Sequence, residues 1–179
     1  MELPRNIKCI IFDLDGTLAN FPIDYESMRK ELRTLFDDKD QKFKPLIDSI
    51  NNLSFDSKTP NILKRALSVV DKYELNSLDG VKLNKEIMDI YSGTELTKII
   101  LTRNSSRLVN SFLEKFDLVK PQMILSRDDV VELKPSIEHI QPVFKKFKFD
   151  REEYLLIGDS VHDKLIAQSS KINYIEYGS

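Results

Sequence analysis

Short apolar runs that alternate with stretches of helical periodicity constrain the fold of this chain more than any other feature of its sequence. The first run, Ile7–Leu14, lies between Pro4 and Gly16 and has the continuous apolar character of a strand covered on both faces. Four later runs have a similar size: Lys98–Leu101, Gln122–Leu125, Tyr154–Ile157 and Ile172–Ile175. Strands separated by helices in this way are typical of a parallel sheet.

Two of the intervening stretches carry apolar residues at helical spacing. The first stretch, which ends at Gly93, contains Leu83, Ile87 and Ile90. The second follows Thr102 and contains Leu108, Phe112, Leu113 and Phe116. Helices of this length can serve as crossovers between parallel strands. We therefore expect an α/β fold with helices on both faces of the sheet.

The stretch at residues 21–78 departs from this alternation, because it offers helical patterns and no convincing strand. One apolar stripe at helical spacing is formed by Met28, Leu32, Leu35 and Phe36. Thr59 followed by Pro60 is a pattern that often starts a helix. We expect a small helical domain here, inserted after the first strand into a core formed by residues 1–20 and 79–179.

The charge balance argues against nucleic acid or an acidic membrane as the partner. The chain carries 27 basic and 29 acidic residues, for a formal charge of -2. Its first residues lack the apolar core of a signal peptide, and no stretch approaches the roughly 18 apolar residues that span a bilayer. We expect a cytoplasmic protein. Cys9 is the only cysteine, which excludes an internal disulfide and a zinc site built on several cysteines.

Two carboxylates stand where the first apolar run ends. Asp13 and Asp15 are two residues apart, and Gly16 allows the chain to turn sharply after them. A carboxylate at the end of a buried strand needs a cation or hydrogen-bond donors, or else it stays protonated. This position therefore predicts a binding partner for at least one of the two aspartates.

The same feature recurs later in the chain. The run Tyr154–Ile157 is followed by Gly158, and then by acidic and hydroxyl residues at Asp159, Ser160 and Asp163. Thr102 follows another predicted strand. Because residues just past the carboxyl ends of neighbouring parallel strands converge on one crevice, we expect Asp13, Thr102 and Asp159 to meet.

Carboxylates without histidine or cysteine favour a hard divalent cation. Magnesium takes one or two protein carboxylates and keeps waters and substrate phosphate oxygens as its other ligands. Lys134 precedes Pro135, which predicts a helix that begins at the proline and places the ammonium group at a helix N-terminus, where anions bind.

These motifs resemble those of the haloacid dehalogenase-like (HAD) phosphatases, in particular the branch similar to phosphoglycolate phosphatases. The resemblance covers roughly residues 1–20 and 79–179. It rests on four ordered motifs: Asp13, Leu14, Asp15, Gly16 and Thr17; Thr102; Lys134 with Pro135; and Gly158, Asp159, Ser160 and Asp163. It implies a Rossmann-like core, a helical cap at 21–78 and a magnesium-dependent phosphatase acting on a small phosphorylated metabolite such as phosphoglycolate, a sugar phosphate or a nucleotide.

The resemblance also implies a role for each matching residue. Asp13 would attack phosphorus and become an aspartyl phosphate. Asp15 would protonate the leaving oxygen, activate water in the second step and ligate Mg²⁺ through its backbone carbonyl. Thr102 would bind a phosphoryl oxygen, and Lys134 would offset negative charge. The metal residues would be Asp13, Asp15, Asp159 and Asp163, with Asp163 supporting from close by.

Further assignments concern the residues beside Thr102 and the alternatives to a phosphatase. Arg103 and Asn104 lie next to Thr102 and are expected to line the crevice and contact substrate. A phosphomutase of the same family and a catalytically idle module that binds a phosphorylated ligand stay open as alternatives. A dehalogenase is disfavoured because Asp15, with the glycine and threonine after it, favours phosphate chemistry. We expect a monomer or a weak dimer.

Overall fold

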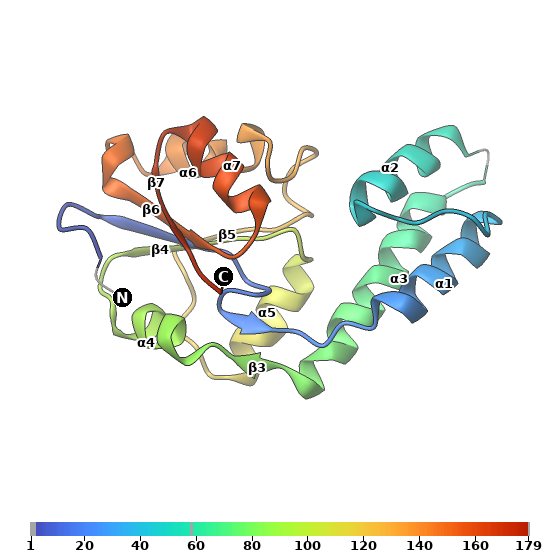
Figure 1. The fold of residues 1–179 in the computed structure, drawn as a ribbon, viewed down its shortest axis with the longest axis horizontal. Coiled ribbons are helices and arrows are strands. Elements are labelled where there is room, and N and C mark those ends of the chain that lie inside the picture. The colour runs from blue at the N-terminus through green and yellow to red at the C-terminus, as the bar shows by residue number, and fades with distance from the viewer. Residues whose placement is uncertain (1–2, 58, 179) are drawn as a thin grey trace. The chain divides into compact units, whose positions relative to one another are not determined.

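The main sheet has five parallel strands in the order β5-β4-β1-β6-β7 (Figure 1). The computed structural model describes residues 3–57 and 59–178. The strands are β1 Cys9–Phe12, β4 Thr97–Leu101, β5 Met123–Leu125, β6 Tyr154–Gly158 and β7 Asn173–Glu176. The central strand β1 pairs with two neighbours, so that Cys9 lies opposite Thr97 on one side and Tyr154 on the other. The predicted α/β fold with a parallel sheet is confirmed.

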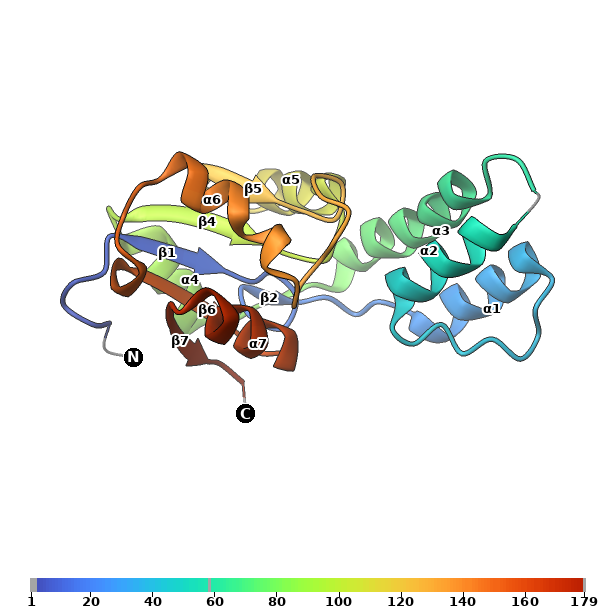
Figure 2. The same ribbon diagram turned by 90° about the horizontal axis from the view of Figure 1, so that it is seen from above.

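Helices cover both faces of this sheet (Figure 1, Figure 2). One face carries α4 (Lys85–Gly93) and α5 (Ser106–Lys115). The other carries α6 (Gln141–Lys146) and α7 (Val161–Ser170). Among the described residues, no helix has both the length and the apolar character required to cross a membrane.

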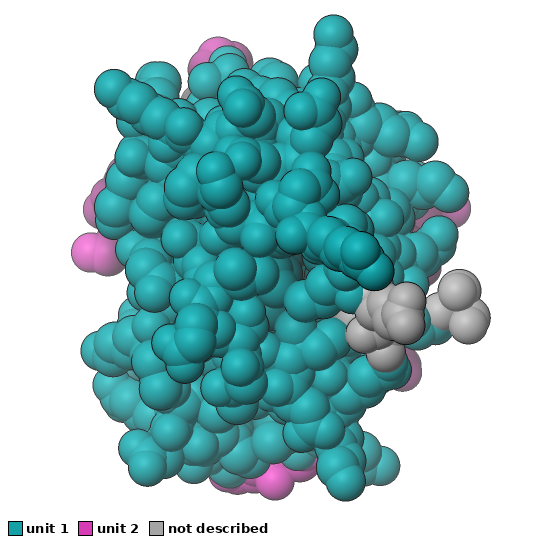
Figure 3. Space-filling model, turned by 90° about the vertical axis from the view of Figure 1, so that its left-hand side faces the viewer, with its two compact units in different colours: residues 1–21, 81–179 teal, residues 22–80 magenta. Residues whose placement is uncertain are grey.

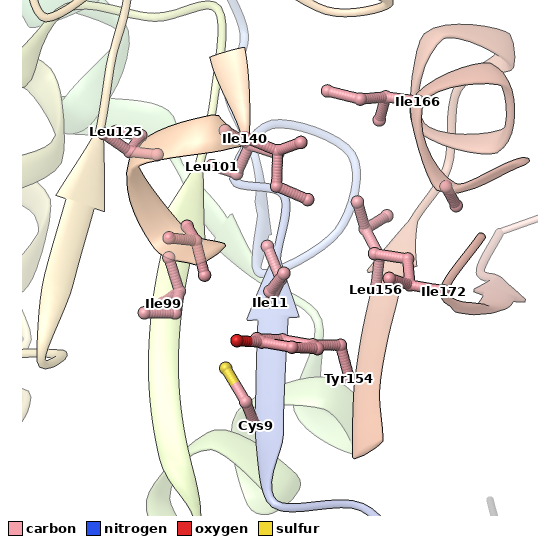
Figure 4. Close-up of a cluster of buried hydrophobic side chains, with 12 residues drawn as sticks. Cys9, Ile11, Ile99, Leu101, Leu125, Ile140, Tyr154, Leu156, Ile166 and Ile172 are labelled. Carbon is pink, nitrogen blue, oxygen red and sulfur yellow. The ribbon is translucent and has the colours of Figure 1, made fainter. Parts of the chain in front are cut away.

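The side chains of β1 alternate between the two layers of helices, as the pleat of a strand requires. Cys9 and Ile11 point to the face of α6 and α7 and belong to one buried apolar cluster (Figure 4). Phe12 points to the opposite face, where its ring packs edge-on against Tyr91 of α4 with 5.3 Å between the centroids. Because both faces of β1 are buried, its residues form the continuous apolar run seen in the sequence.

The chain forms two compact units, which Figure 3 distinguishes by colour. One unit consists of residues 1–21 and 81–179 and contains the five-stranded sheet. The other, residues 22–80, contains α1 (Tyr25–Phe36), α2 (Leu46–Asp56) and α3 (Ile62–Asn76), followed by the short 3-10 helix η1 (Ser77–Gly80). The roles of catalytic core and cap stay predictions.

Some local elements differ from the sequence prediction. The helix expected to start at Thr59 and Pro60 begins at Ile62, because Asn61 adopts a left-handed conformation with φ of 57° and ends the preceding turn. α2 had no predicted counterpart. Neither did the small antiparallel pair of β2 (Ala19–Asn20) and β3 (Lys82–Leu83), which takes Leu83 out of the predicted helix.

Candidate active site

The strands β1 and β6 lie side by side, and an aspartate follows each of them. Asp13 comes directly after β1, and its backbone N–H donates to the carbonyl of Ile157 in β6 at 3.0 Å. Asp159 comes directly after β6. The chain adds β4 and β5 on one side of β1 before it places β6 on the other side. In open α/β sheets, ligands bind where the strand order reverses in this way.

Lys134 joins two of the predicted site aspartates. Its Nζ lies 2.7 Å from Oδ1 of Asp13 and 2.6 Å from Oδ1 of Asp163. All three side chains are buried, and each ion pair is also a hydrogen bond in which the ammonium group donates. Charges in such a place require partners, because little water reaches them. One ammonium group shared by two carboxylates leaves this buried group with a net negative formal charge.

The segment around Lys134 corrects one prediction. The helix does not begin at Pro135. Ser136 instead caps a short 3-10 helix, η2 (Ile137–His139), by accepting from the backbone N–H of Glu138. Serine favours such caps because its hydroxyl competes for the first backbone donors of the helix. The Lys134 ammonium group is therefore held by carboxylates, and the helix that follows is too short for the predicted anion site.

His139 holds the backbone of Lys134. Its Nδ1 accepts from the Lys134 N–H at 3.0 Å, and the residue is fully buried. Burial, together with the positive charge of Lys134, lowers the pKa of His139 to about 4. The ring is thus neutral near pH 7 and carries its proton on Nε2. His139 was not among the predicted site residues, because its only signal in the sequence is a histidine between Ile137 and Ile140.

Asp163 uses both of its carboxylate oxygens within the protein. Oδ1 accepts from Lys134, while Oδ2 accepts from the backbone N–H and the hydroxyl of Ser160 at the start of α7. Ser160 and Asp163 together form a capping box, in which each side chain satisfies a backbone donor near the other residue. The spacing of a serine three residues before an acid is the sequence signal for this arrangement.

Two glycines leave room for the aspartates. Gly16 adopts φ of +89°, and a Cβ atom placed on it would lie 2.0 Å from Oδ2 of Asp159. A Cβ atom on Gly158 would lie 2.5 Å from Cγ of Asp163. Both distances are far shorter than a normal van der Waals contact. The position of each carboxylate therefore depends on the absence of a side chain at its neighbouring glycine.

The environment raises the pKa of two site carboxyls. Burial is the main cause at Asp13, where repulsion from Asp163 adds to it and Lys134 opposes it, and the pKa reaches about 7. Burial and the charge of Asp163 also raise the pKa of Asp159. Burial lowers the pKa of Lys134, but the two carboxylates outweigh this effect and the net change is upward. Asp13, which is buried, is thus costly to ionise without an additional cation, whereas Asp159 is exposed.

Three carboxylates are close enough to share one metal ion. Asp13, Asp159 and Asp163 each offer an oxygen, and the three oxygens lie within 4.8 Å of one another. The carboxylate of Asp15 is not a member of this group in the described part of the chain. Its Oδ1 accepts instead from the backbone N–H of Phe21 at 3.1 Å. The structure thus brings Asp13, Asp159 and Asp163 together, whereas Asp15 stays among the predicted ligands through its carbonyl alone.

The predicted substrate-binding residues lie past the end of β4. The hydroxyl of Thr102 donates to Oδ1 of Asn104 at 2.8 Å and accepts from the Asn104 N–H at 3.1 Å. Arg103 is half-buried, and its Nη1 lies 3.2 Å from Nε2 of His162 in α7. The loop after β4 is therefore tied to the first turn of α7. The substrate contacts predicted for Thr102, Arg103 and Asn104 stay predictions.

Comparison with known proteins agrees with this arrangement. A family model described as haloacid dehalogenase-like hydrolase matches residues 10–176. A haloacid dehalogenase-like hydrolase domain-containing protein of Arabidopsis thaliana is 21% identical to this chain over 166 residues. The match covers 89% of this chain and 65% of the Arabidopsis protein, so this chain spans less than two thirds of that protein's length. Pyrophosphatase PpaX of Oceanobacillus iheyensis is 26% identical over 179 residues, covering 93% of this chain and 81% of that protein.

Solved structures share the fold. CbbY from Rhodobacter sphaeroides, solved in complex with phosphate, gives a TM-score of 0.73 at 18% identity and covers 97% of this chain and 87% of its own. A hydrolase from Pseudomonas syringae gives a TM-score of 0.69 at 21% identity, and the match covers 94% of this chain and 84% of that hydrolase. The family model spans nearly the whole chain, so the resemblance drawn from the four motifs is confirmed. The chain belongs to the haloacid dehalogenase-like hydrolases.

Proposed function

We propose that this chain is a magnesium-dependent phosphatase that hydrolyses a small phosphorylated metabolite through an aspartyl phosphate on Asp13. One observation carries the proposal: the buried ion pairs of Asp13, Lys134 and Asp163, with Asp159 beside them at the ends of β1 and β6. The group has a net negative charge inside the protein. A catalytic carboxylate that awaits a cation and a phosphate explains this arrangement better than a structural ion pair does.

The donor set fits magnesium. Carboxylate oxygens are the ligands that hard divalent cations prefer, and magnesium usually takes one or two of them from the protein. Asp13 and Asp159 would hold Mg²⁺ together with the backbone carbonyl of Asp15. Asp163 would support the site by holding Lys134, since its two oxygens are already hydrogen-bonded. When bound, the ion supplies positive charge that favours the approach of a phosphate dianion and stabilises the charge that develops during transfer.

The reaction has two steps in which Asp13 is the nucleophile and Asp15 moves the proton. In the first, a carboxylate oxygen of Asp13 bonds to phosphorus, the bond to the leaving oxygen breaks, and the carboxyl group of Asp15 gives that oxygen its proton. In the second, the Asp15 carboxylate takes a proton from water, whose oxygen attacks phosphorus and releases Asp13 as a carboxylate. Covalent capture divides a slow hydrolysis into two easier steps.

Lys134 and the loop after β4 would hold the phosphoryl group. The ammonium group of Lys134 lies 2.7 Å from Asp13 and offsets the charge that would otherwise repel a phosphate. Thr102 would turn its hydroxyl from Asn104 to a phosphoryl oxygen, and Arg103 and Asn104 would contact the substrate nearby. All of these residues belong to the unit of residues 1–21 and 81–179, to which we assign catalysis. Residues 22–80 keep the proposed role of a cap.

The relatives suggest which substrates to test. PpaX is named a pyrophosphatase, and CbbY was solved with phosphate. The panel therefore contains pyrophosphate, phosphoglycolate, sugar phosphates, nucleotides and a generic aryl phosphate. Release of inorganic phosphate would be measured with Mg²⁺, with EDTA and with the Asp13→Asn variant. Asp89→Asn is the matched control, because it makes the same chemical change at an exposed carboxylate on α4.

The expected result is release of phosphate from one or a few compounds in wild type and in the control, and none with EDTA or with Asp13→Asn. Conversion of a sugar phosphate to its isomer without release of phosphate would identify a phosphomutase instead. No turnover of any compound, combined with a ligand that raises the melting temperature, would favour a phospho-ligand binding module. Turnover that survives Asp13→Asn would refute the mechanism.

A further inference from the structure

Residues 22–80 contain a pocket lined mainly by basic side chains. Its volume is about 390 Å³, and it is lined by Glu26, Arg29, Arg33, Lys42 and Lys44. None of these residues belongs to the site at the ends of β1 and β6, and all lie in one compact unit. The volume falls within the range of roughly 300 to 1,000 Å³ that is usual for small-molecule sites.

One wall of the pocket is a face of α1. Glu26, Arg29 and Arg33 occur three and four residues apart within Tyr25–Phe36, so they project from the same side of the helix. The adjoining side of the helix carries Met28 and Leu32, which are fully buried. The apolar stripe of α1 thus fixes the helix against its own unit and turns the two guanidinium groups into the pocket.

The second wall is the loop that joins α1 to α2, and hydrogen bonds hold it in place. Phe43 lies between the two lining lysines, and its ring is fully buried next to that of Phe36 with 5.8 Å between centroids. Nε of Arg33 donates to the carbonyl of Gln41 at 2.8 Å, and Oδ1 of Asp38 accepts from the Gln41 N–H at 3.1 Å. The loop therefore presents Lys42 and Lys44 from a fixed backbone.

The positive charge is local to the pocket. Residues 22–80 carry 10 basic and 11 acidic side chains, so the segment as a whole is slightly acidic. Within the pocket, four cations face one carboxylate, that of Glu26. Cations on helices are usually dispersed and solvated. Here the sequence gathers them around a hollow instead, which creates a field that attracts anions.

Arg29 gives an independent sign that something is to be bound. Its Nε is buried and, among the described residues, has no hydrogen-bond partner. Its guanidinium carbon lies over the ring of Tyr25, 5.3 Å from the centroid, so the group also makes a cation–π contact. A buried donor without an acceptor is costly, and a planar guanidinium group matches the two oxygens of a phosphate or carboxylate.

We propose that this pocket is a second anion site of the protein, one that binds a small soluble anion with two or more negative charges, such as a diphosphate or a phosphorylated acid. Arg29 and Arg33 would bind its oxygens by paired hydrogen bonds, and Lys42 and Lys44 would supply charge from the loop. The site goes beyond the proposed phosphatase activity, because no residue is shared with the Asp13 site.

The test uses the full chain and pyrophosphate as the probe, in EDTA so that no metal assists binding elsewhere. Amide shifts in a ¹⁵N-labelled sample would be followed for residues 26–44 at low and at moderate salt. The variant Lys42→Gln with Lys44→Gln removes two lining charges and leaves Arg33 and the loop bonds intact. Its control is Lys30→Gln with Lys39→Gln, which changes the net charge equally at two exposed lysines outside the pocket.

We expect saturable shifts in residues 26–44 of the wild type and of the control, with weaker binding at higher salt. The Lys42 and Lys44 variant should bind about tenfold more weakly or worse, as charge-assisted hydrogen bonds are lost. Arg29→Lys, which keeps the charge and loses the planar fork, should weaken binding too.

Three outcomes would overturn the proposal. They are the absence of saturable shifts in residues 26–44, equal weakening in the variant and its control, and binding to vesicles of anionic phospholipid without binding to pyrophosphate. Shifts confined to residues around Asp13 would also place the anion elsewhere. Each of these results is independent of phosphate release in the substrate panel, so this proposal and the proposed phosphatase activity can fail separately.

Discussion

The Asp13→Asn variant should be more stable than the wild type when metal is absent, although it should be inactive. Asp13 is buried, and its environment raises the pKa from 3.8 to about 7. Above that pH, folding moves a carboxylate that is already ionised in the unfolded chain into a place with little water. Asparagine has nearly the same shape and no charge, and its carbonyl oxygen can still accept from Lys134. Lys134 also keeps Asp163 as a partner.

The magnitude follows from the difference in proton binding between the native and the unfolded chain. A group whose pKa is higher in the native state favours folding at low pH, and this contribution is lost as the pH rises through the native value. With 3.8 unfolded and about 7 folded, the ionised form lowers the free energy of unfolding by up to about 4 kcal/mol at pH 8 and by less than about 2 kcal/mol at pH 5.

Part of this gain is lost, because a neutral amide binds an ammonium group less strongly than a carboxylate does. We therefore expect the free energy of unfolding of Asp13→Asn to exceed that of the wild type by about 2 kcal/mol at pH 8 in EDTA. Most of this difference should disappear at pH 5. The measurement is urea denaturation of both proteins at the two pH values. Added Mg²⁺ should reverse the order at pH 8, since only the wild type offers the ion a carboxylate at this position.

Asp89→Asn is again the control, and it should change stability little at either pH because its carboxylate is exposed. If Asp13→Asn were less stable than the wild type at pH 8 in EDTA, the ion pair with Lys134 would outweigh the cost of burial. If the difference did not depend on pH, Asp13 would not titrate near neutrality. Either result would refute the claim that the buried, ionised Asp13 carboxylate destabilises the protein when metal is absent.

Two further predictions concern the support of the site. Gly16→Ala should lower stability by about 1 kcal/mol or more and weaken Mg²⁺ binding in a calorimetric titration, since the new Cβ atom would lie 2.0 Å from Oδ2 of Asp159. Gly93→Ala, where nothing lies within 4 Å, should be neutral or slightly stabilising, and equal losses in both variants would contradict this argument. His139→Leu leaves the Lys134 N–H without its acceptor and should cost about 1–3 kcal/mol in urea denaturation, more than His139→Asn. Because the pKa of His139 falls from 6.5 to about 4 on folding, this residue should cost the wild type stability as the pH falls from 6.5 to about 4, and neither variant should show that loss. Equal acid sensitivity in the wild type and in the two variants would contradict this account.

The sequence predicted the sheet well, because its strands are buried on both faces and read as uninterrupted apolar runs. The run around Phe12, for example, packs against helices on either side. The same logic located the site, since acids that follow such runs must lie at one edge of the sheet. Asp13 and Asp159 thus meet although they are far apart in the chain.

The missing details depend on side-chain hydrogen bonds and local backbone conformations that no periodicity reveals. The start of η2 is set by the hydroxyl of Ser136, and the start of α3 by the left-handed backbone of Asn61. The ion pair between Lys134 and Asp163 could not be predicted from sequence patterns either. Lys134 and Asp163 are on separate elements, and only the packing of α7 against the sheet brings them within 2.6 Å.

The central position of β1 also bears on the order in which the protein assembles. Its Cys9 pairs with Thr97 and with Tyr154, so β1 must wait for two partner strands that are synthesised later. The helices of residues 22–80, by contrast, find their neighbours nearby in the chain. Distant pairings cost more chain entropy and form more slowly than local ones. We therefore expect the helical segment to fold during synthesis, and the ion pair of Lys134 with Asp163 to be among the last contacts to form.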